Sequence, residues 1–282
     1  MRTALTVDIG GTKCSVAITD DDGVHHRHTW PTVGSIENLD HVRAFYDDHL
    51  AAGGAMAEAV GVCFGGPVDF RSRTVKRSVH VDGWQGFDFS RWAREAFNLP
   101  VAVDNDANVG ALAEFYHGQH EANDLLYVTV STGIGAGVIS DGRLIRGATN
   151  EAGELGHVRV RDDDRVCSCG RTGCLERLCS GYWIERDYGR PAAELFADDA
   201  FLADYSTTLA RGLASAVLLY NPLVIVLGGG VSRVGDRLTT ALAERLTDDL
   251  ASWSHLVPGL TVSTFDLNGV HLGAKELTRD LF

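Results

Sequence analysis

The sequence of 282 residues predicts an α/β fold made of two similar halves. Each half opens with two short apolar runs around a glycine-rich turn: residues 4–19 with the turn at 10–11, and residues 125–139 with the turn at 132–137. Such pairs are typical of β-hairpins, and runs of helical periodicity follow both. The repeated order of hairpin, strand and helix favours two lobes that each bury a sheet.

In the first half, the hairpin ends at a turn over residues 20–23. A short uninterrupted apolar run further on predicts a buried strand, which Gly65-Gly66-Pro67 terminates. Asn and Asp at the start of the last helix of this half suit the N-cap. We expect helices at 36–52 and 105–117 and strands at 59–64 and 101–103.

In the second half, Asn221-Pro222 separates a long apolar helix from a buried strand. The surrounding stretch, residues 212–232, is the longest without charge. The break makes it too short for a membrane span, which needs about 20 apolar residues. We expect helices at 205–220, 231–250 and 269–281 and strands at 223–227 and 260–264.

The composition limits the partners. The chain contains 25 Lys and Arg and 38 Asp and Glu, which gives a net charge of −13. This charge disfavours non-specific binding to nucleic acid or to an acidic membrane surface. Because the chain enters a strand at Ala4 without a basic and apolar leader, we expect a cytoplasmic protein. In that reducing compartment, three of the six cysteines crowded within 167–174 indicate a metal before disulfides.

The glycine turns offer backbone N–H groups to an anion. Asp8-Ile9-Gly10-Gly11-Thr12-Lys13 lies between two strands, and Thr129 to Gly137 repeats the arrangement with added hydroxyls. Glycine leaves no Cβ in the way of a polyphosphate, although a plain hairpin turn explains a lone Gly-Gly equally well. A strand ending in Gly228-Gly229-Gly230 could admit a base or a phosphate, or simply form a tight connection. The sequence contains neither GxxxxGK[ST] nor a clean GxGxxG.

Polar side chains also follow the strand at 101–103. Asp104-Asn105-Asp106 stands at its carboxyl end, where open α/β sheets place ligands. A carboxylate beside an amide can hydrogen-bond a polyol, and one carboxylate can accept the proton of an attacking hydroxyl. The alternative is that these residues are only helix caps.

The most specific pattern is a metal knuckle. His157 precedes Cys167, Cys169 and Cys174, with glycines between the last two cysteines. One imidazole and three thiolates form a closed tetrahedral set, so a bound zinc would be structural. The alternative is three buried thiols near a surface histidine. A loop fixed in this way could hold the flanking carboxylates of Glu154 and Glu176 towards a polar substrate.

These motifs, in this order, resemble the ROK family of sugar kinases within the actin/hexokinase-like ATPase superfamily. The resemblance rests on DIGGTK at 8–13, NDAN at 105–108, GELGH at 153–157 and CxCGxxGCxE at 167–176. It implies a two-lobed actin-like ATPase fold in which a ribonuclease H-like motif is duplicated, with a cleft between the lobes and a zinc-bound loop in the second lobe. The implied lobes are residues 1–118, with the terminal helix 268–282 returning to them, and residues 119–267.

The resemblance also implies a role for each motif, with Asp106 as the catalytic base. The implied residues are Gly66, Asn105, Asp106, Glu154, His157 and Glu176 for the sugar; Gly10, Gly11, Thr12, Lys13, Thr132 and Gly133 for the ATP phosphates; Asp8 for Mg²⁺ through water; Gly228, Gly229 and Gly230 for adenosine; and His157, Cys167, Cys169 and Cys174 for structural Zn²⁺.

Several residues depart from the common family pattern. Ser131 and Ala136 replace frequent glycines, Asn150 stands where glycine is common, and SVHVDGW at 78–84 lacks the usual Asn-Leu pair. Because the changes at 150 and at 78–84 touch the implied sugar pocket, they leave the substrate open.

The expected activity is transfer of a phosphoryl group from MgATP to a hexose, and the 6-hydroxyl of glucose is the favoured acceptor. N-acetylmannosamine, mannose and fructose are alternative acceptors, and ADP or polyphosphate are alternative donors. ROK relatives include sugar-responsive repressors that carry a helix-turn-helix ahead of this body; seven residues before Asp8 and the acidic charge argue against that class. A non-catalytic member is a further alternative. The resemblance implies a homodimer.

Overall fold

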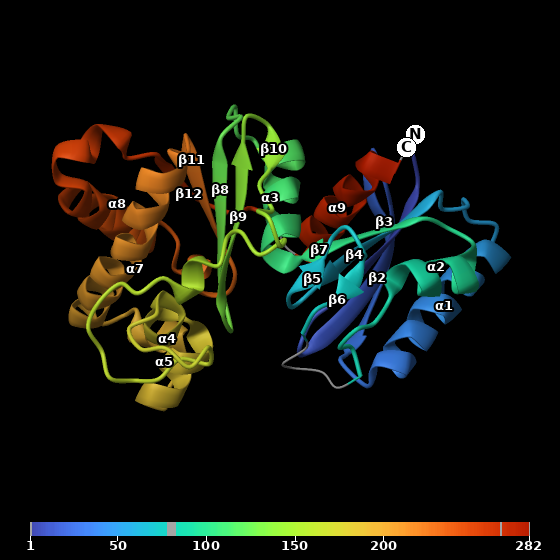
Figure 1. The fold of residues 1–282 in the computed structure, drawn as a ribbon, viewed down its shortest axis with the longest axis horizontal. Helices are drawn as coiled ribbons and strands as arrows, with labels where there is room; N and C mark the ends of the chain where they lie inside the picture. The colour runs from blue at the N-terminus through green and yellow to red at the C-terminus, as the bar shows by residue number, and fades with distance from the viewer. Residues whose placement is uncertain (1, 78–82, 266, 282) are drawn as a thin grey trace. The chain divides into compact units, whose positions relative to one another are not determined.

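A computed structural model describes residues 2–77, 83–265 and 267–281 (Figure 1). Backbone contacts divide the chain into two units. Unit 1 comprises Met1–His117, Gly147–Glu151 and Phe265–Phe282, and unit 2 comprises Gly118–Arg146 and Ala152–Thr264. Residues 78–82 of the divergent SVHVDGW stretch lie outside the described residues. In the described part of the chain, no helix is both long and apolar enough to cross a membrane.

Each unit is built on a five-stranded mixed sheet, and the two sheets have the same topology. The strand orders are β3-β2-β1-β4-β7 in unit 1 and β10-β9-β8-β11-β12 in unit 2. In both, the first three strands of the chain segment pair antiparallel and the later two join in parallel. The predicted α/β class and the repeated topology are therefore confirmed.

Unit 1 contains more regular structure than the periodicity predicted. Its strands are β1 Ala4–Ile9, β2 Lys13–Asp20, β3 Gly23–Pro31, β4 Ala59–Phe64, β5 Val68–Asp69, β6 Thr74–Val75 and β7 Val101–Asn105; its helices are α1 Ser35–Ala51, α2 Phe89–Phe97, α3 Asp106–His117, α9 Leu267–Leu277 and the 3-10 helix Thr278–Leu281. The strand β3 was not expected, because its HHRHT segment is polar and exposed at the sheet edge. The helix α2 was also missed; the Asp88 side chain caps it by accepting from the Arg91 N–H at 3.0 Å.

The C-terminal helix α9 packs closely in unit 1 because glycines remove side chains at both of its contacts. A Cβ on Gly61 of β4 would lie 2.0 Å from the carbonyl oxygen of Ala274 on α9. A Cβ on Gly273 would lie 2.0 Å from the carbonyl oxygen of Val109 on α3. The helix therefore packs against both the sheet and α3, and Figure 1 shows α9 beside α3.

Unit 2 buries its core between the sheet and the pair α7 and α8. Its strands are β8 Leu125–Val130, β9 Ile134–Ser140, β10 Arg143–Leu144, β11 Val224–Gly228 and β12 Gly259–Val262; its helices are α4 Leu175–Cys179, α5 Gly181–Tyr188, α6 Ala192–Leu195, α7 Asp199–Tyr220, α8 Asp236–Leu250 and 3-10 helices at Leu155–His157, Val231–Val234 and Ala251–Leu256. Leu209 and Leu213 of α7 and Leu242 and Leu246 of α8 are fully buried in this core.

Several boundaries differ from the sequence predictions, and three of the differences have a clear physical reason. The single helix expected at 231–250 is two helices, because Gly235 between them has a φ of +72°. The helix α7 begins at Asp199 rather than 205, since Asp198 caps it by accepting from two backbone N–H groups. Residues 147–151 belong to unit 1, where the Asn150 side chain donates to Asp69 at 3.1 Å and Lys76 pairs with Glu151 at 3.4 Å.

The contact between β4 and α9 yields a test of the fold. The substitution Gly61→Ala should lower the free energy of unfolding by about 2–4 kcal/mol, because the new methyl group cannot fit beside the Ala274 carbonyl. Gly259→Ala in β12 is the matched control: its Cβ would meet atoms no closer than 3.7 Å. Urea unfolding measures both; equal stabilities of the two variants would contradict the packing described.

Candidate functional site

Carboxylates gather at one edge of the sheet of unit 1. Parallel pairing sets Asp8 of β1 opposite Cys63 of β4, and Cys63 opposite Asp104 of β7. Asp106 follows at the first position of α3. Because the carboxyl ends of parallel strands meet at one edge, the chain brings these acids together as open α/β sheets do at ligand sites.

Of the residues Asp104-Asn105-Asp106, Asn105 does act as a helix cap. The Asn105 side chain accepts from the Asn108 N–H at 2.8 Å, as an N-cap residue does. Asn108 also donates through its side chain to Asp104 at 2.8 Å, which fixes the end of β7. Asp106 accepts from the N–H of Ala107 at 2.9 Å, and the residue is exposed to solvent. The Asp106 carboxylate is thus open to a substrate.

The surroundings of Asp8 and Asp106 resist negative charge. The pKa of Asp8 is raised to about 6, because burial and then the charge of Asp106 outweigh the hydrogen bonds from Cys63 and Ser15 and the charge of Lys13, which lower it. Asp106 is accessible, but the surrounding protein partly desolvates its carboxyl group, and this raises the pKa above the ordinary value. Hydrogen bonds from the backbone lower the pKa and so oppose the shift. Raised carboxyl pKa values favour proton acceptance near neutral pH.

The first glycine turn, at Gly10 to Lys13, is the exposed end of the β1–β2 hairpin. The Gly10 N–H donates to the Lys13 carbonyl at 3.0 Å, and Gly11, Thr12 and Lys13 are exposed. The turn that contains Gly66 lies against it, because the Gly65 N–H donates to the Ile9 carbonyl at 2.8 Å. A Cβ on Gly65 would lie 3.4 Å from the Gly10 Cα.

The second glycine turn, in unit 2, is held by Glu176. The Ser131 N–H donates to the Gly133 carbonyl at 2.9 Å, which closes the turn. One carboxylate oxygen of Glu176 accepts from the Ile134 N–H at 3.1 Å, and the other accepts from Ser168 at 3.2 Å. A Cβ on Gly133 would lie only 2.8 Å from the same carboxylate. Glu176 therefore joins this turn to the cysteine loop.

Four side chains converge in unit 2 as a candidate metal centre. The ligand atoms of His157, Cys167, Cys169 and Cys174 all lie within 4.8 Å of one another. Two thiolates at about 2.3 Å from a tetrahedral zinc lie about 3.8 Å apart. The Cys169 and Cys174 sulfurs are 3.7 Å apart, and the Cys167 sulfur is 3.7 Å from the His157 Nδ1. The donor set and its spacing fit one Zn²⁺ with all four positions filled by protein.

His157 has a separate nitrogen for each implied role. Its Nδ1 faces the cysteines, and its Nε2 lies 3.8 Å from a carboxylate oxygen of Glu154. A metal-bound imidazole is commonly oriented by a carboxylate at its other nitrogen. A zinc held at Nδ1 would thus fix Nε2 and Glu154 as a polar pair.

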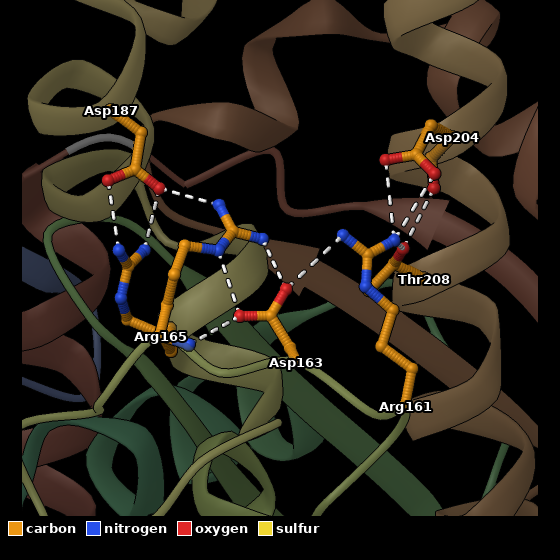
Figure 2. A network of polar contacts seen from close by, with 7 residues as sticks. Arg161, Asp163, Arg165, Asp187, Asp204 and Thr208 are labelled. Carbon is orange, nitrogen blue, oxygen red and sulfur yellow. Dashed lines mark hydrogen bonds and ion pairs between the residues drawn. The ribbon is translucent and has the colours of Figure 1, made fainter.

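An ion-pair network fixes the segment between His157 and Cys167 (Figure 2). Arg165 donates to Asp163 and to Asp187 on α5, both at 2.7 Å, and Arg161 donates to Asp204 on α7 at 3.2 Å. On the far side of Asp187, Arg177 makes two further hydrogen bonds. Hydrogen bonds from Arg165 lower the pKa of Asp163 to about 2. The loop is therefore anchored to two helices independently of a metal.

A cavity of about 590 Å³ lies within unit 2, beside the second glycine turn. Ser131, Thr132 and Gly230 line it, as do the charged residues Glu185, Arg233 and Arg237. Apolar side chains form much of the remaining wall: Pro191, Ala192, Ala193, Phe196, Ala197, Val231 and Val234. The volume and the apolar wall suit a flat ring system with a polar extension.

Of the three consecutive glycines, Gly230 lines this cavity. Gly228 and Gly229 have a different physical role. A Cβ on Gly228 would lie 2.1 Å from the Tyr127 hydroxyl, and one on Gly229 would lie 2.4 Å from the Val130 carbonyl. Close packing against β8 therefore accounts for glycine at both positions.

The family model described as the ROK family matches residues 4–280. The chain belongs to the ROK family. A ROK hexokinase structure from Thermus thermophilus is 32% identical, with a TM-score of 0.84 over 98% of this chain and 97% of that one. A ROK family glucokinase structure from Streptomyces griseus, in complex with glucose and AMPPNP, is 26% identical, with a TM-score of 0.81 over 99% of both chains. The predicted actin-like ATPase fold is confirmed by these likenesses.

Among curated relatives, a glucokinase from Halalkalibacterium halodurans is 33% identical over 215 residues. The match covers 64% of this chain and 64% of the relative, which is less than two thirds of either.

Sequence reasoning missed the buried donors beneath the carboxylates of this ROK protein. Cys63 and Ser15 hydrogen-bond Asp8, and His271 of α9 hydrogen-bonds Ser15 at 3.0 Å. Strand pairing alone could have indicated Ser15 and Cys63, since both lie opposite Asp8 in register. His271 comes from 256 residues further along the chain and carried no local signal.

The raised pKa of Asp8 predicts a stabilising substitution at the site. The carboxyl group of Asp8 ionises less readily in the folded chain than in the unfolded chain. The free energy of unfolding is therefore lower above about pH 6, where Asp8 is ionised in both states, than at low pH. Asp8→Asn should therefore raise the free energy of unfolding by about 1–3 kcal/mol at pH 8 in metal-free and nucleotide-free buffer. The gain should shrink as the pH falls towards 4. Thermal unfolding at several pH values measures it; a variant less stable than the wild type at pH 8 would contradict the assignment.

The cysteine cluster predicts about one tightly held zinc per chain. Native mass spectrometry should detect it, and Cys174→Ser should abolish it because the tetrahedral set loses a ligand. Cys14→Ser, at a buried cysteine of β2 outside the cluster, should retain the metal. A wild-type protein purified with zinc available and yet metal-free would refute the site.

Proposed function

We propose that this chain transfers the terminal phosphoryl group of ATP to a hydroxyl group of a hexose, with glucose as the preferred acceptor and its 6-hydroxyl as the nucleophile. The observation that carries the proposal is Asp106: an accessible carboxylate of raised pKa at the start of α3, whose charge acts on the half-buried Asp8. Membership of the ROK family and the likeness to hexokinase and glucokinase structures support the same activity.

In the proposed reaction, Asp106 accepts the proton of the attacking hydroxyl. Phosphoryl transfer needs little covalent help; it needs an aligned nucleophile, neutralised phosphate charge and a proton acceptor. The new bond joins the sugar oxygen to the γ-phosphorus, and the bond from that phosphorus to the bridging oxygen of ADP breaks. The carboxylate of Asp8 can accept a hydrogen bond from a water molecule bound to Mg²⁺. When bound, Mg²⁺ would neutralise part of the phosphate charge.

We propose a separate contribution from each unit. In unit 1 the exposed turn at Gly10 to Lys13 serves the phosphates, and Gly66, Asn105 and Asp106 serve the sugar. In unit 2 Thr132 and Gly133 serve the phosphates, while Glu154, His157 and Glu176 serve the sugar. The zinc would act through structure alone, since four protein ligands leave no open position.

The cavity in unit 2 supports a nucleotide rather than polyphosphate as donor. Its apolar wall, which includes Phe196 and Val231, suits a base, a group that polyphosphate lacks. Arg233 and Arg237 also line the cavity and can pair with the phosphate groups of either donor. We extend the proposal to a cytoplasmic homodimer. Three exposed leucines at the end of α7 and just beyond it, Leu218, Leu219 and Leu223, support a buried interface there.

A matrix of acceptors and donors tests the proposal. Glucose, mannose, fructose and N-acetylmannosamine are each combined with ATP, ADP or polyphosphate, and sugar phosphate is measured directly. Asp106→Asn should lower kcat by about 10²- to 10⁴-fold because the proton acceptor is lost. Sugar affinity, measured by calorimetry, should stay within a few-fold.

Asp88→Asn is the matched control, because Asp88 is another aspartate at a helix start in unit 1 and asparagine can still cap α2. Its kcat should equal that of the wild type. Sugar binding without transfer from any donor would indicate a sensor instead of a kinase, and near-normal turnover by Asp106→Asn would remove the proposed base.

A further inference from the structure

A chain of buried polar groups lies directly beneath Asp8 in unit 1. Thr6 and Asp8 are two residues apart on β1 and therefore share one face of the sheet, and their antiparallel partners on β2 are Ala17 and Ser15. His271 of α9 contacts this face: its Nδ1 is 3.0 Å from the Thr6 hydroxyl and its Nε2 is 3.0 Å from the Ser15 hydroxyl. His271 is fully buried.

The groups at the two ends of the chain differ in charge. At one end the Thr19 hydroxyl lies 2.8 Å from that of Thr6. At the other end, Ser15 and Cys63 lie opposite Asp8 in the register of the sheet, and hydrogen bonds from both side chains lower the pKa of its carboxyl group. Thr6, Thr19 and His271 are 0% exposed and Ser15 is 4% exposed, so the protein itself must satisfy each polar atom.

The hydrogens can be assigned by counting donors. Ser15 has one hydroxyl hydrogen, and a hydrogen bond to a carboxylate is stronger than one to a neutral ring. If Ser15 donates to Asp8, its oxygen must accept from the Nε2–H of His271. Nδ1 then accepts from the Thr6 hydroxyl, which in turn accepts from Thr19. The Thr6 hydroxyl also lies 3.2 Å from the Ala17 carbonyl, and the opposite tautomer would use that contact.

We propose that His271 is a positioning residue for the phosphate side of the site: as its Nε2–H tautomer it donates to Ser15 and thereby commits the Ser15 hydrogen to Asp8. This inference rests on the proposed function, in which Asp8 serves the magnesium-bound donor. The four hydrogen bonds run in one direction, from Thr19 through Thr6, His271 and Ser15 to Asp8. Aligned bonds polarise one another, which strengthens the last bond to the carboxylate.

The arrangement requires a neutral ring. Burial first, and then the positive charge of Arg27, lower the pKa of His271 to about 3, although a hydrogen bond to the Thr6 backbone, which favours the charged ring, opposes the shift. The ring therefore keeps one hydrogen at neutral pH. A charged ring would donate from both nitrogens, and Thr6 could then no longer donate to it.

The tautomer is measured directly by two-bond ¹H–¹⁵N correlation spectra of the whole protein labelled with ¹⁵N-histidine. His271 is identified by the signal that disappears in His271→Gln. We expect the pattern of a neutral ring with hydrogen on Nε2. Hydrogen on Nδ1, or a charged ring, would overturn the proposal whether or not the protein is a kinase.

Kinetics separate positioning from a merely structural role. Ser15→Ala and Thr19→Val each remove one buried hydroxyl from β2, and both should lower thermal stability. Only Ser15→Ala should lower kcat/KM for MgATP strongly, by about 10- to 100-fold, as loss of a supporting hydrogen bond commonly does. Thr19→Val should stay within about threefold, because it lies furthest from Asp8.

His271→Gln provides the conservative rescue, since its amide can donate to Ser15 and accept from Thr6. It should retain kcat/KM better than His271→Leu. Equal kinetic losses in Ser15→Ala and Thr19→Val would reduce the network to a structural role and overturn the proposal. Absence of any phosphoryl transfer by the wild type would refute the proposed function and the role of His271 together, whereas the wrong tautomer refutes the role of His271 alone.

Discussion

The candidate site depends on keeping carboxylates charged where the protein disfavours charge. Parallel pairing of β1 and β4 fixes Asp8 beside Cys63, and Asp106 begins α3 nearby. Burial and the neighbouring charge both raise the pKa of Asp8, and donors from Cys63 and Ser15 oppose the shift. The buried donors are therefore as much a part of the site as the exposed acids, because they set the protonation state on which proton transfer and cation binding depend.

Close backbone approach is the second constraint, and glycine permits it in both units. In unit 1, Gly61 and Gly273 let α9 approach the sheet and α3, which brings His271 to the face that carries Asp8. In unit 2, a Cβ on Gly156 would lie 2.3 Å from the Ile134 carbonyl, so the 3-10 helix that carries His157 packs on the second turn. The metal ligands, the ion pairs of Figure 2 and Glu176 then hold the neighbouring loop.

Local sequence patterns predicted the features of the structure that depend on residues close together in the chain. The hairpins, the repeated topology and the cysteine knuckle follow from alternation, turn residues and ligand spacing, and the structure contains all three. Polar β3 was missed because an exposed edge strand has no apolar alternation to detect. The sequence showed glycines at 228 and 229 but not the reason for them, since packing against β8 is a tertiary contact. His271 was invisible for the same reason: its partners on β1 and β2 lie more than 250 residues away in the chain.

The coupling between the two acids is the central claim, and a ¹³C-carboxyl NMR titration of Asp8 tests it most directly. We predict that Asp8 in the wild type titrates at a pKa of about 6, and that Asp106→Asn moves this value down, because the negative charge that adds to the effect of burial is gone. An Asp8 that titrates at its ordinary value of 3.8 in both proteins would contradict the account.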